Sequence, residues 1–200
     1  MLLDWLATQL VENEWQLKPI HKLIMTSAAY MQGSEITKNG QDRDPENMLF
    51  WRRSSRRLEA EIIRDALLSV SDSLDKSMYG KGTLDEKSLR RSVYFTVKRG
   101  QLIPLLQLFD APDAMQGIAT RERSTVAPQA LAMLNSPIVR DLATKFAARV
   151  RPSESTSIAE AIDRAYHTAL SRPASVDEIE TMTAFIERQK KLRAEDPNAE

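Results

Sequence analysis

Arginine is the residue type in this sequence whose placement most readily suggests chemistry. Basic residues gather in four short groups beside predicted turns, at 52–57 (RRSSRR), 90–91 (RR), 98–99 (KR) and 121–123 (RER). Asp110 and Asp113 flank a proline turn between them. A guanidinium fork matches the oxygens of carboxylate, sulfate and phosphate groups. These groups either converge on a pocket for an anion or a sugar acid, or form Arg–Asp pairs that tie loops to a core. The second interpretation is favoured.

Carboxylates suggest a second chemistry. Glu61 and Asp65 lie one helical turn apart, where two carboxylates can share a proton or a cation. Arg57 and Arg64 lie at i−4 and i+3 from Glu61, where ordinary helix ion pairs form, so a structural role is favoured. Glycoside hydrolysis needs two carboxyl groups roughly 5–9.5 Å apart. The carboxyls whose separation tests that hypothesis are Asp65, Asp110 and Asp113.

Motifs for metals and cofactors are missing from the sequence. There is no phosphate-binding glycine loop, nucleophile elbow or two-histidine zinc helix, and His21 and His167 are expected to pack or face solvent. Residues 42–46 (DRDPE) alternate acids like a calcium loop, but Asn47 and Arg53 replace its glycine and its final glutamate. With no cysteine, the chain has no disulfide, thiolate nucleophile or attachment site for c-type haem. We expect no metal or cofactor in this segment.

The overall charge argues against nucleic acid as a partner. Lys plus Arg total 28 and Asp plus Glu total 28, whereas phosphate binding usually shows as a basic excess. Binding of nucleic acid through Arg52 to Arg57 is therefore the least favoured hypothesis. No apolar run approaches the ~20 residues that span a bilayer. The first residues, MLLDWL, contain no basic region followed by a long apolar stretch, so no signal peptide is expected in this chain.

Apolar residues at helical spacing predict a mainly α fold, a multi-helix globular array. Helices are expected at 2–14, 19–31, 56–71, 102–109, 125–134, 137–150, 157–170 and 175–192. On the helix over 56–71, Leu58, Ile62, Ala66 and Val70 repeat every four residues, and Ile63 and Leu67 widen the stripe expected to face the core. Residues 32–47 and 72–90 are expected to be loops. Thr125 is expected to cap a helix with Pro128 in its first turn.

The β-branched and aromatic run at 92–97 (SVYFTV) predicts at most one short β-hairpin or strand pair. Two capping boxes, Ser157-x-x-Glu160 and Ser175-x-x-Glu178, predict an antiparallel helical hairpin joined by Ser171-Arg172-Pro173. We therefore expect a helical core over 1–150, truncated at its N-terminal side, a hairpin packed on it over 151–192, and a frayed tail at 193–200.

Several segments, in order, resemble a known family: 3–7 (LDWLA), 15–30 (WxxKxxHxxIxxSxxY), 44–49 (DPxNxL), 57–66 (RLxAExxRDA), 90–94 (RRSVY), 108–113 (LFDxPD), 129–136 (QALxxLNS) and 165–173 (AYxxALxRP). Over about residues 2–180 they are similar to the planctomycete PSD-type domain of unknown function. One departure is Asp72, which stands where the family usually has glycine.

The resemblance implies context more than mechanism. It implies the C-terminal part of a large exported protein, at the cell surface or in the periplasm, with other domains of the same polypeptide as partners. A neighbouring domain is often cytochrome-c-like, and haem would belong there. The motif positions offered as binding candidates are Arg64, Asp65, Arg91, Tyr94, Asp110, Asp113, Arg121 and Asn135.

Two functions follow from these expectations. The favoured one is a structural or binding module of a large exported, cytochrome-linked multidomain protein, with no recognisable catalytic motif. The alternative is a hydrolase-like or carbohydrate-binding domain that acts on acidic or sulfated polysaccharide through an Arg/Asp/Tyr cluster.

Overall fold

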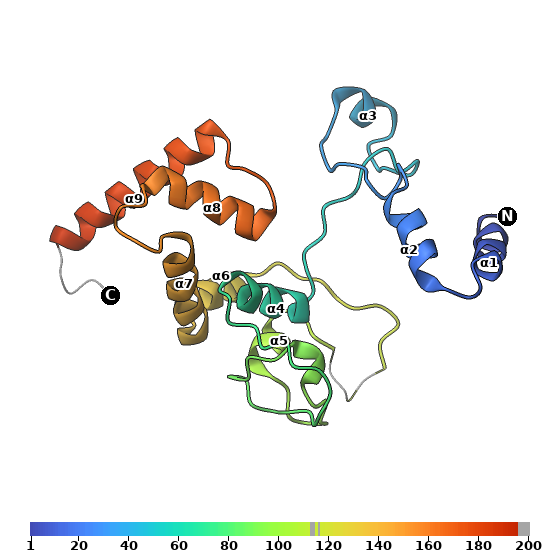
Figure 1. Cartoon of the computed structure of the whole chain (residues 1–200), viewed down its shortest axis with the longest axis horizontal. Coiled ribbons are helices and arrows are strands. Elements are labelled where there is room, and N and C mark those ends of the chain that lie inside the picture. Colours follow the sequence, from blue (N-terminus) through green and yellow to red (C-terminus); the bar gives the residue numbers. More distant parts are fainter. Residues whose placement is uncertain (113–114, 116, 196–200) are drawn as a thin grey trace. The chain divides into compact units, whose positions relative to one another are not determined.

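The computed structural model describes residues 1–112, 115 and 117–195, and its secondary structure is almost entirely helical (Figure 1). Contacts divide the chain into a first unit, Met1–Arg57, and a second unit, Leu58–Glu200. The helices of the first unit are α1 (Leu2–Glu12), α2 (Leu17–Met25) and α3 (Lys38–Arg43). Those of the second are α4 (Ala60–Val70), α5 (Pro104–Leu108), α6 (Ala127–Asn135), α7 (Pro137–Val150), α8 (Ile158–Leu170) and α9 (Val176–Glu195). The expected mainly α fold is confirmed.

In the first unit, the second helix is shorter than predicted, and a short helix lies in the predicted loop. α2 ends at Met25 rather than Met31, because the hydroxyls of Thr26 and Ser27 donate to the carbonyls of Lys22 and Ile24. α3 lies within 32–47 and begins after Thr37, whose hydroxyl accepts from the amide of Gly40 at 3.2 Å.

Gly40 shows why this short helix needs a glycine. The ring of Trp51 packs against it so closely that an added Cβ would lie 2.5 Å from ring carbons. The indole Nε1–H of Trp51 also donates to the carbonyl of Asp44 at 2.8 Å. Trp51 therefore fastens the following loop to α3.

The core of the second unit lies where α4 meets α5. Its buried cluster consists of Ala60, Ile103, Leu106 and Phe109, with Ile63, Phe95 and Met133 packed against it. Figure 1 shows α4 and α5 next to each other, and α7 also contacts α4. Burial of these apolar side chains stabilises the unit and fixes the direction of the side chains on α4.

The face of α4 that is buried differs from the predicted one. Leu58 and Ile62 are about half exposed, at 51% and 49%, whereas Ala60, Arg64 and Leu68 are buried. The predicted stripe was wrong in part: Ile63 packs against the core, but apolar periodicity assigns a charged residue such as Arg64 to the solvent side. Here a buried arginine occupies the centre of the inner face.

At its C-terminal end, α4 has a left-handed residue. Asp72 has φ +58°, its amide donates to the carbonyl of Ser69 at 3.1 Å, and the amide of Ser73 donates to the carbonyl of Leu68 at 2.8 Å. This is the Schellman arrangement, in which glycine is usual at the left-handed position. At the same end of α4, Arg149 of α7 donates to the carbonyls of Ser69 and Val70.

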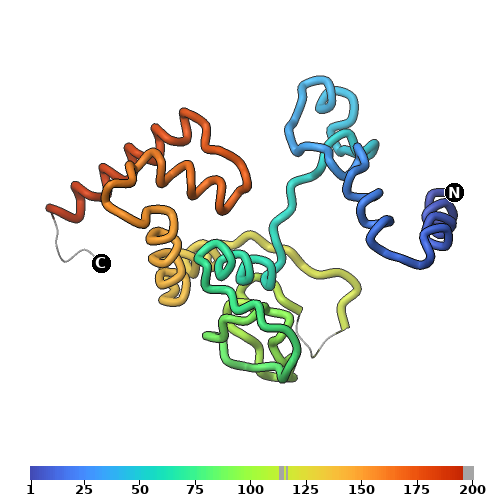
Figure 2. The backbone as a smooth tube through the Cα atoms, in the orientation of Figure 1, coloured from blue at the N-terminus to red at the C-terminus, as the bar shows by residue number. Residues whose placement is uncertain are grey.

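No regular strand forms at 92–97, which stays within the predicted limit of one short strand pair. Ser92–Tyr94 forms a 3₁₀ turn, η1, and only Phe95 pairs, through an isolated bridge to Thr83. The amide of Thr83 donates to the Tyr94 carbonyl, and the amide of Thr96 donates to the Thr83 carbonyl. Gly82 permits this approach, since a Cβ there would lie 2.6 Å from the Thr96 hydroxyl. Residues 72–99, hereafter the coil segment, fold into a compact loop beside α4 and α5 (Figure 2).

The helices after residue 125 follow the sequence closely. α6 begins one residue later than a Thr125 cap requires, with Val126 as the N-cap residue. The break at Ser136 and the α8–α9 hairpin are confirmed, with Ser157 capping α8 and Ser175 pairing reciprocally with Glu178. α9 continues to Glu195, past the expected start of fraying at 193. Across the described ranges, no helix combines the length and apolarity needed to cross a bilayer.

Candidate functional site

Arg64 is the centre of the most extensive polar network in the second unit. It is 4% exposed, and its Nη1 donates to the Arg90 carbonyl at 2.9 Å and to the Ser92 hydroxyl at 3.3 Å. Its Nη2 donates to the Ser88 carbonyl, and its guanidinium lies 4.5 Å from the centre of the Phe95 ring. Burial lowers the pKa of Arg64, because desolvation disfavours the cation. The guanidinium thus binds the backbone of the coil segment.

Asp65 holds the same turn from the next position on α4. Its Oδ1 accepts from both the amide and the hydroxyl of Ser92, each at 2.7 Å, and lies 3.6 Å from Arg64 Nη1. Its Oδ2 lies 3.7 Å from Nε of Arg91, which is exposed. Three predicted candidates therefore meet at Ser92, which is buried and was not predicted.

Tyr94 belongs to a clamp inside the coil segment. Its hydroxyl accepts from the amide of Tyr79 at 2.8 Å, and the guanidinium of Arg90 lies 3.6 Å from the centre of its ring. Arg90 donates to the carbonyls of Ser77, Tyr79 and Lys81. Arg90 was not among the binding candidates. Its hydrogen bonds hold distant parts of the coil segment together.

Asp110 organises the connection between α5 and α6. It has φ +63°, and its carboxylate accepts from the amide of Ser124 at 2.7 Å and from its hydroxyl at 2.9 Å. Gln129, which is 5% exposed, donates to that hydroxyl at 3.3 Å and to the Leu108 carbonyl at 3.0 Å. Asp113 lies outside the described residues.

Arg121 pairs with carboxylates far away in sequence. Its Nη1 lies 2.9 Å from Glu59 Oε2 and from Glu61 Oε2, and its Nη2 lies 2.6 Å from Glu61 Oε1. Arg123 adds a contact to Glu59 at 3.2 Å. The hydrogen bond from Arg121 lowers the pKa of Glu61, and the same bond raises the pKa of Arg121. Arg64, one of the predicted partners of Glu61, faces Asp65 and the coil segment instead.

The candidates therefore fall into distinct local clusters. Arg64, Asp65 and Arg91 meet at Ser92, whereas Arg121 meets Glu59 and Glu61. Asn135 is the exposed last residue of α6. Signals for the unpredicted partners were weak, because Ser92 and Gln129 are ordinary polar residues inside longer motifs.

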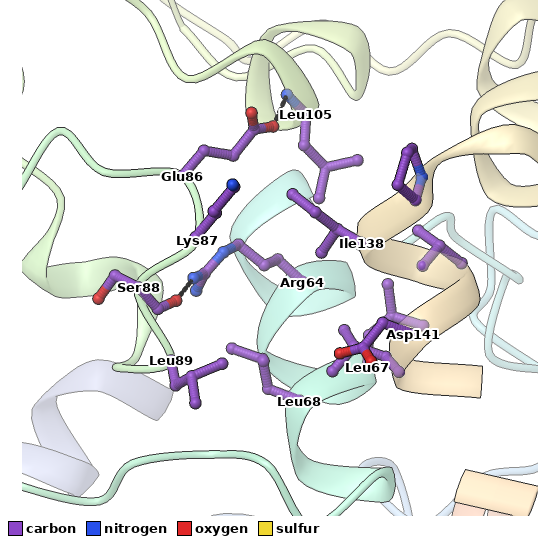
Figure 3. Close-up of a pocket in the computed structure, with 13 residues that line it drawn as sticks. Arg64, Leu67, Leu68, Glu86, Lys87, Ser88, Leu89, Leu105, Ile138 and Asp141 are labelled. Carbon is purple, nitrogen blue, oxygen red and sulfur yellow. Dashed lines mark hydrogen bonds between the residues drawn. The ribbon is translucent and has the colours of Figure 1, made fainter. Parts of the chain in front are cut away.

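Two cavities lie beside these clusters. The first, about 300 Å³, has walls of leucine and isoleucine from α4, α5 and α7, with Arg64 and Lys87 at its edge (Figure 3). Glu86, at the same edge, accepts from the amide of Leu105 at 3.3 Å. The second, about 230 Å³, is lined by Phe95, Gln101, Glu61 and Arg121 among others. Both are small and partly apolar, which suits a small group or side chain.

The first unit has a larger and more polar cavity of about 630 Å³. It is lined by Tyr30, Asn47, Arg52, Arg53 and Arg56 among others. Arg52, Arg53 and Arg56, from the basic group at 52–57, thus line a cavity, which agrees in part with the interpretation that the basic groups form a pocket. The binding candidates named from the motifs are not among the residues that line it.

Comparison with known proteins gives a family and no function. No curated protein and no solved structure matches the chain. A family model described as "Protein of unknown function (DUF1553)" matches residues 1–186, which is nearly the whole chain. The chain therefore belongs to the PSD1 family of proteins of unknown function.

Proposed function

We propose that this chain is a structural or binding module of a larger exported protein, and that it works through contacts rather than through catalysis. One observation carries the proposal. Arg64, Asp65 and Arg121, the charged candidates on and around α4, are engaged by the backbone or by carboxylates of the same unit. Such engagement fixes loops on a helix.

The acid–base chemistry of the carboxylates supports the same proposal. A general acid must be protonated near neutral pH and must reach substrate. The pKa of Glu61 is lowered by its bond with Arg121, so its carboxyl is ionised at neutral pH. Asp65 Oδ1 accepts two hydrogen bonds, from the amide and the hydroxyl of Ser92. These two carboxylates suit architecture better than proton transfer.

The cellular context in this proposal rests on the family resemblance alone. From that resemblance we infer that the chain is part of an exported, cytochrome-linked protein whose other domains are its partners. Haem attached as in cytochromes c does not fit this segment, which contains no cysteine. The coding sequence upstream tests the context: we expect a signal peptide and a Cys-x-x-Cys-His motif there, and their absence would contradict it.

Turnover assays test the molecular part of the proposal. The purified chain would be incubated with polygalacturonate, dextran sulfate and a nitrophenyl ester. We expect no reducing ends, free sulfate or nitrophenol above a buffer blank. Product formation that rises with protein concentration would contradict the proposal that the chain is a non-catalytic module.

A hydrolase-like or carbohydrate-binding role is the second candidate, although the Arg/Asp/Tyr positions named for it lie in separate local clusters. It is favoured by Glu61 and Arg121 sharing the wall of the cavity of about 230 Å³. If that cavity acts on an acidic polysaccharide, Glu61→Gln should abolish turnover or binding while the helical circular dichroism stays unchanged. An unchanged signal in that variant would exclude the role for this cavity.

A further inference from the structure

The first unit contains a loop, 44–54, whose backbone is fixed from within. Asn47 is 8% exposed and has φ +57°. Its Nδ2 donates to the Arg52 carbonyl at 2.8 Å and to the Ser54 hydroxyl at 3.2 Å, and its Oδ1 accepts from the Arg52 amide at 3.2 Å. The Asp44 carboxylate accepts hydrogen bonds from the two backbone amides that follow Asn47, those of Met48 and Leu49. A loop held this way presents its side chains in a defined geometry.

The arginines that this loop presents rest on aromatic rings. The guanidinium carbon of Arg52 lies 5.4 Å from the centre of the Trp51 ring, and that of Arg53 lies 5.6 Å from the centre of the Tyr30 ring. Stacking of this kind orients a guanidinium and leaves the N–H groups on its edge available. The arginines are therefore positioned before any ligand arrives.

Unlike Arg64 and Arg121, these arginines have no carboxylate partner among the described residues. No ion pair in that part of the chain joins Arg52, Arg53 or Arg56 to a carboxylate, whereas Arg64 pairs with Asp65 and Arg121 pairs with Glu59 and Glu61. Nε of Arg52 is buried without a hydrogen-bond partner. A buried cationic donor without a partner is unfavourable, and an anionic ligand would supply what is missing.

The cavities around the arginines are wider and more polar than those of the second unit. The cavity of about 630 Å³ contains Gln32 beside the arginines, and a second one of about 640 Å³ shares Arg52 and contains Ser34 and Asn39. Arg52 thus borders both, so their joint lining combines cations with neutral hydrogen-bonding groups. An extended ligand that carries hydroxyls and widely spaced anionic groups matches this lining.

We propose that this face, defined by Arg52, Arg53 and Arg56, binds an acidic oligosaccharide. Its carboxylate or sulfate groups bind the three guanidinium forks, and its hydroxyls bind the neutral side chains. This inference rests on the proposed function as a binding module. Duplex DNA fits less well, because binding of its closely spaced phosphates usually shows as a basic excess, and the chain has equal numbers of acidic and basic residues. Glu35 and Glu46, which also line the cavities, oppose any anion and favour a ligand whose anionic groups are widely spaced.

The test is retention of the full chain on immobilised polygalacturonate and dextran sulfate, with neutral dextran and duplex DNA as comparison arms. The site variant is Arg52→Gln/Arg53→Gln/Arg56→Gln. A matched control, Arg140→Gln/Arg188→Gln/Arg193→Gln, removes the same charge from exposed positions on α7 and α9. The polygalacturonate and dextran sulfate arms also separate carboxylate from sulfate recognition.

We expect wild type and control to bind an acidic glycan with similar affinity, and the site variant to bind at least about tenfold more weakly. Replacing the three arginines by lysine should lose part of the affinity, because an ammonium cannot form the two parallel bonds of the fork. Neutral dextran should not be retained.

Three results would overturn the site: no acidic glycan is retained, the site variant binds like wild type, or duplex DNA binds more tightly than either glycan. Release of reducing ends from the retained glycan would instead overturn the non-catalytic module, so the two failures are distinguishable.

Discussion

At the scale of single residues, charge in the second unit serves to attach loops. Arg64 is buried on the inner face of α4, and its guanidinium is bonded to carbonyls of the coil segment. Asp65 holds Ser92 from the neighbouring position. Removing one member of such a network leaves the other groups buried without partners, which costs more than the net gain from forming one bond.

Asp65→Asn tests this use of charge. The amide keeps the shape of the side chain but loses the charge that strengthens the bonds with Ser92 and the ion pairs, so we expect a loss of about 1–2 kcal/mol in the free energy of unfolding. Asp141→Asn is the control, because Asp141 is exposed and its ion pair among the described residues is with Lys145, one turn away. That pair contributes about 0.5 kcal/mol or less. Equal losses in urea titrations of the two variants would contradict the account.

Sequence reasoning found many of these residues but not their partners. Arg64, Asp65 and Arg121 stood out by type and motif, and each takes part in a network. Asp65 and Ser92 are 27 positions apart, and Arg121 and Glu59 are 62 apart. Local spacing carries no information on contacts of that range, so the pattern favoured a set of internal ties over a pocket without identifying the partners.

At the scale of elements, local signals for helix ends were more reliable than those for helix faces. Both capping boxes and the Ser136-Pro137 break were predicted, because caps depend on neighbours three or four residues away. The buried face of α4 was predicted only in part, and the run at 92–97 forms a 3₁₀ turn and an isolated bridge in place of a regular strand. Tertiary bonds to Arg64 and Asp65 decided both, and they override propensity.

Asp72→Gly tests the left-handed end of α4. Glycine adopts positive φ without a steric penalty, so we expect the substitution to raise the free energy of unfolding by about 0.5 kcal/mol. Ser69→Gly is the control, because Ser69 is exposed inside the same helix and glycine there should destabilise by about 1 kcal/mol. Thermal unfolding of both variants measures the two signs, and destabilisation by Asp72→Gly would contradict the prediction.

The start of α9 should respond to pH through Glu178. The side-chain bond from Arg172, and next the backbone bond from Ser175, lower the pKa of Glu178 from its ordinary 4.5 to about 2. A lowered pKa means that the ionised form is favoured in the folded state. Its contribution to stability is therefore complete above pH 4.5 and is lost as the pH falls towards about 2.

We thus expect the difference in urea midpoint between wild type and Glu178→Gln to shrink steadily below pH 4.5. Glu187→Gln, on the same helix, should give a smaller difference at neutral pH, since Glu187 has only an exposed contact with Lys190. A difference for Glu178→Gln that grows on acidification would show that the sign is wrong.

At the scale of the whole molecule, the chain consists of two units with different uses of arginine. The second unit contains its own apolar core and the networks of Arg64, Asp65 and Arg121. A unit with its own core can fold alone. We expect a fragment over 58–195 to unfold cooperatively in urea with a helical signal, and a gradual transition would contradict this independence.

The central claim is that Arg64 fastens the coil segment to α4. Hydrogen–deuterium exchange of the full chain, followed by mass spectrometry, tests it most directly. Arg64→Met should raise exchange in peptides covering 83–96, where the amides of Thr83 and Ser92 are bonded, and leave α8 and α9 unchanged. Arg140→Met, at an exposed site on α7, should change neither region. Unchanged protection over 83–96 in Arg64→Met would contradict the claim.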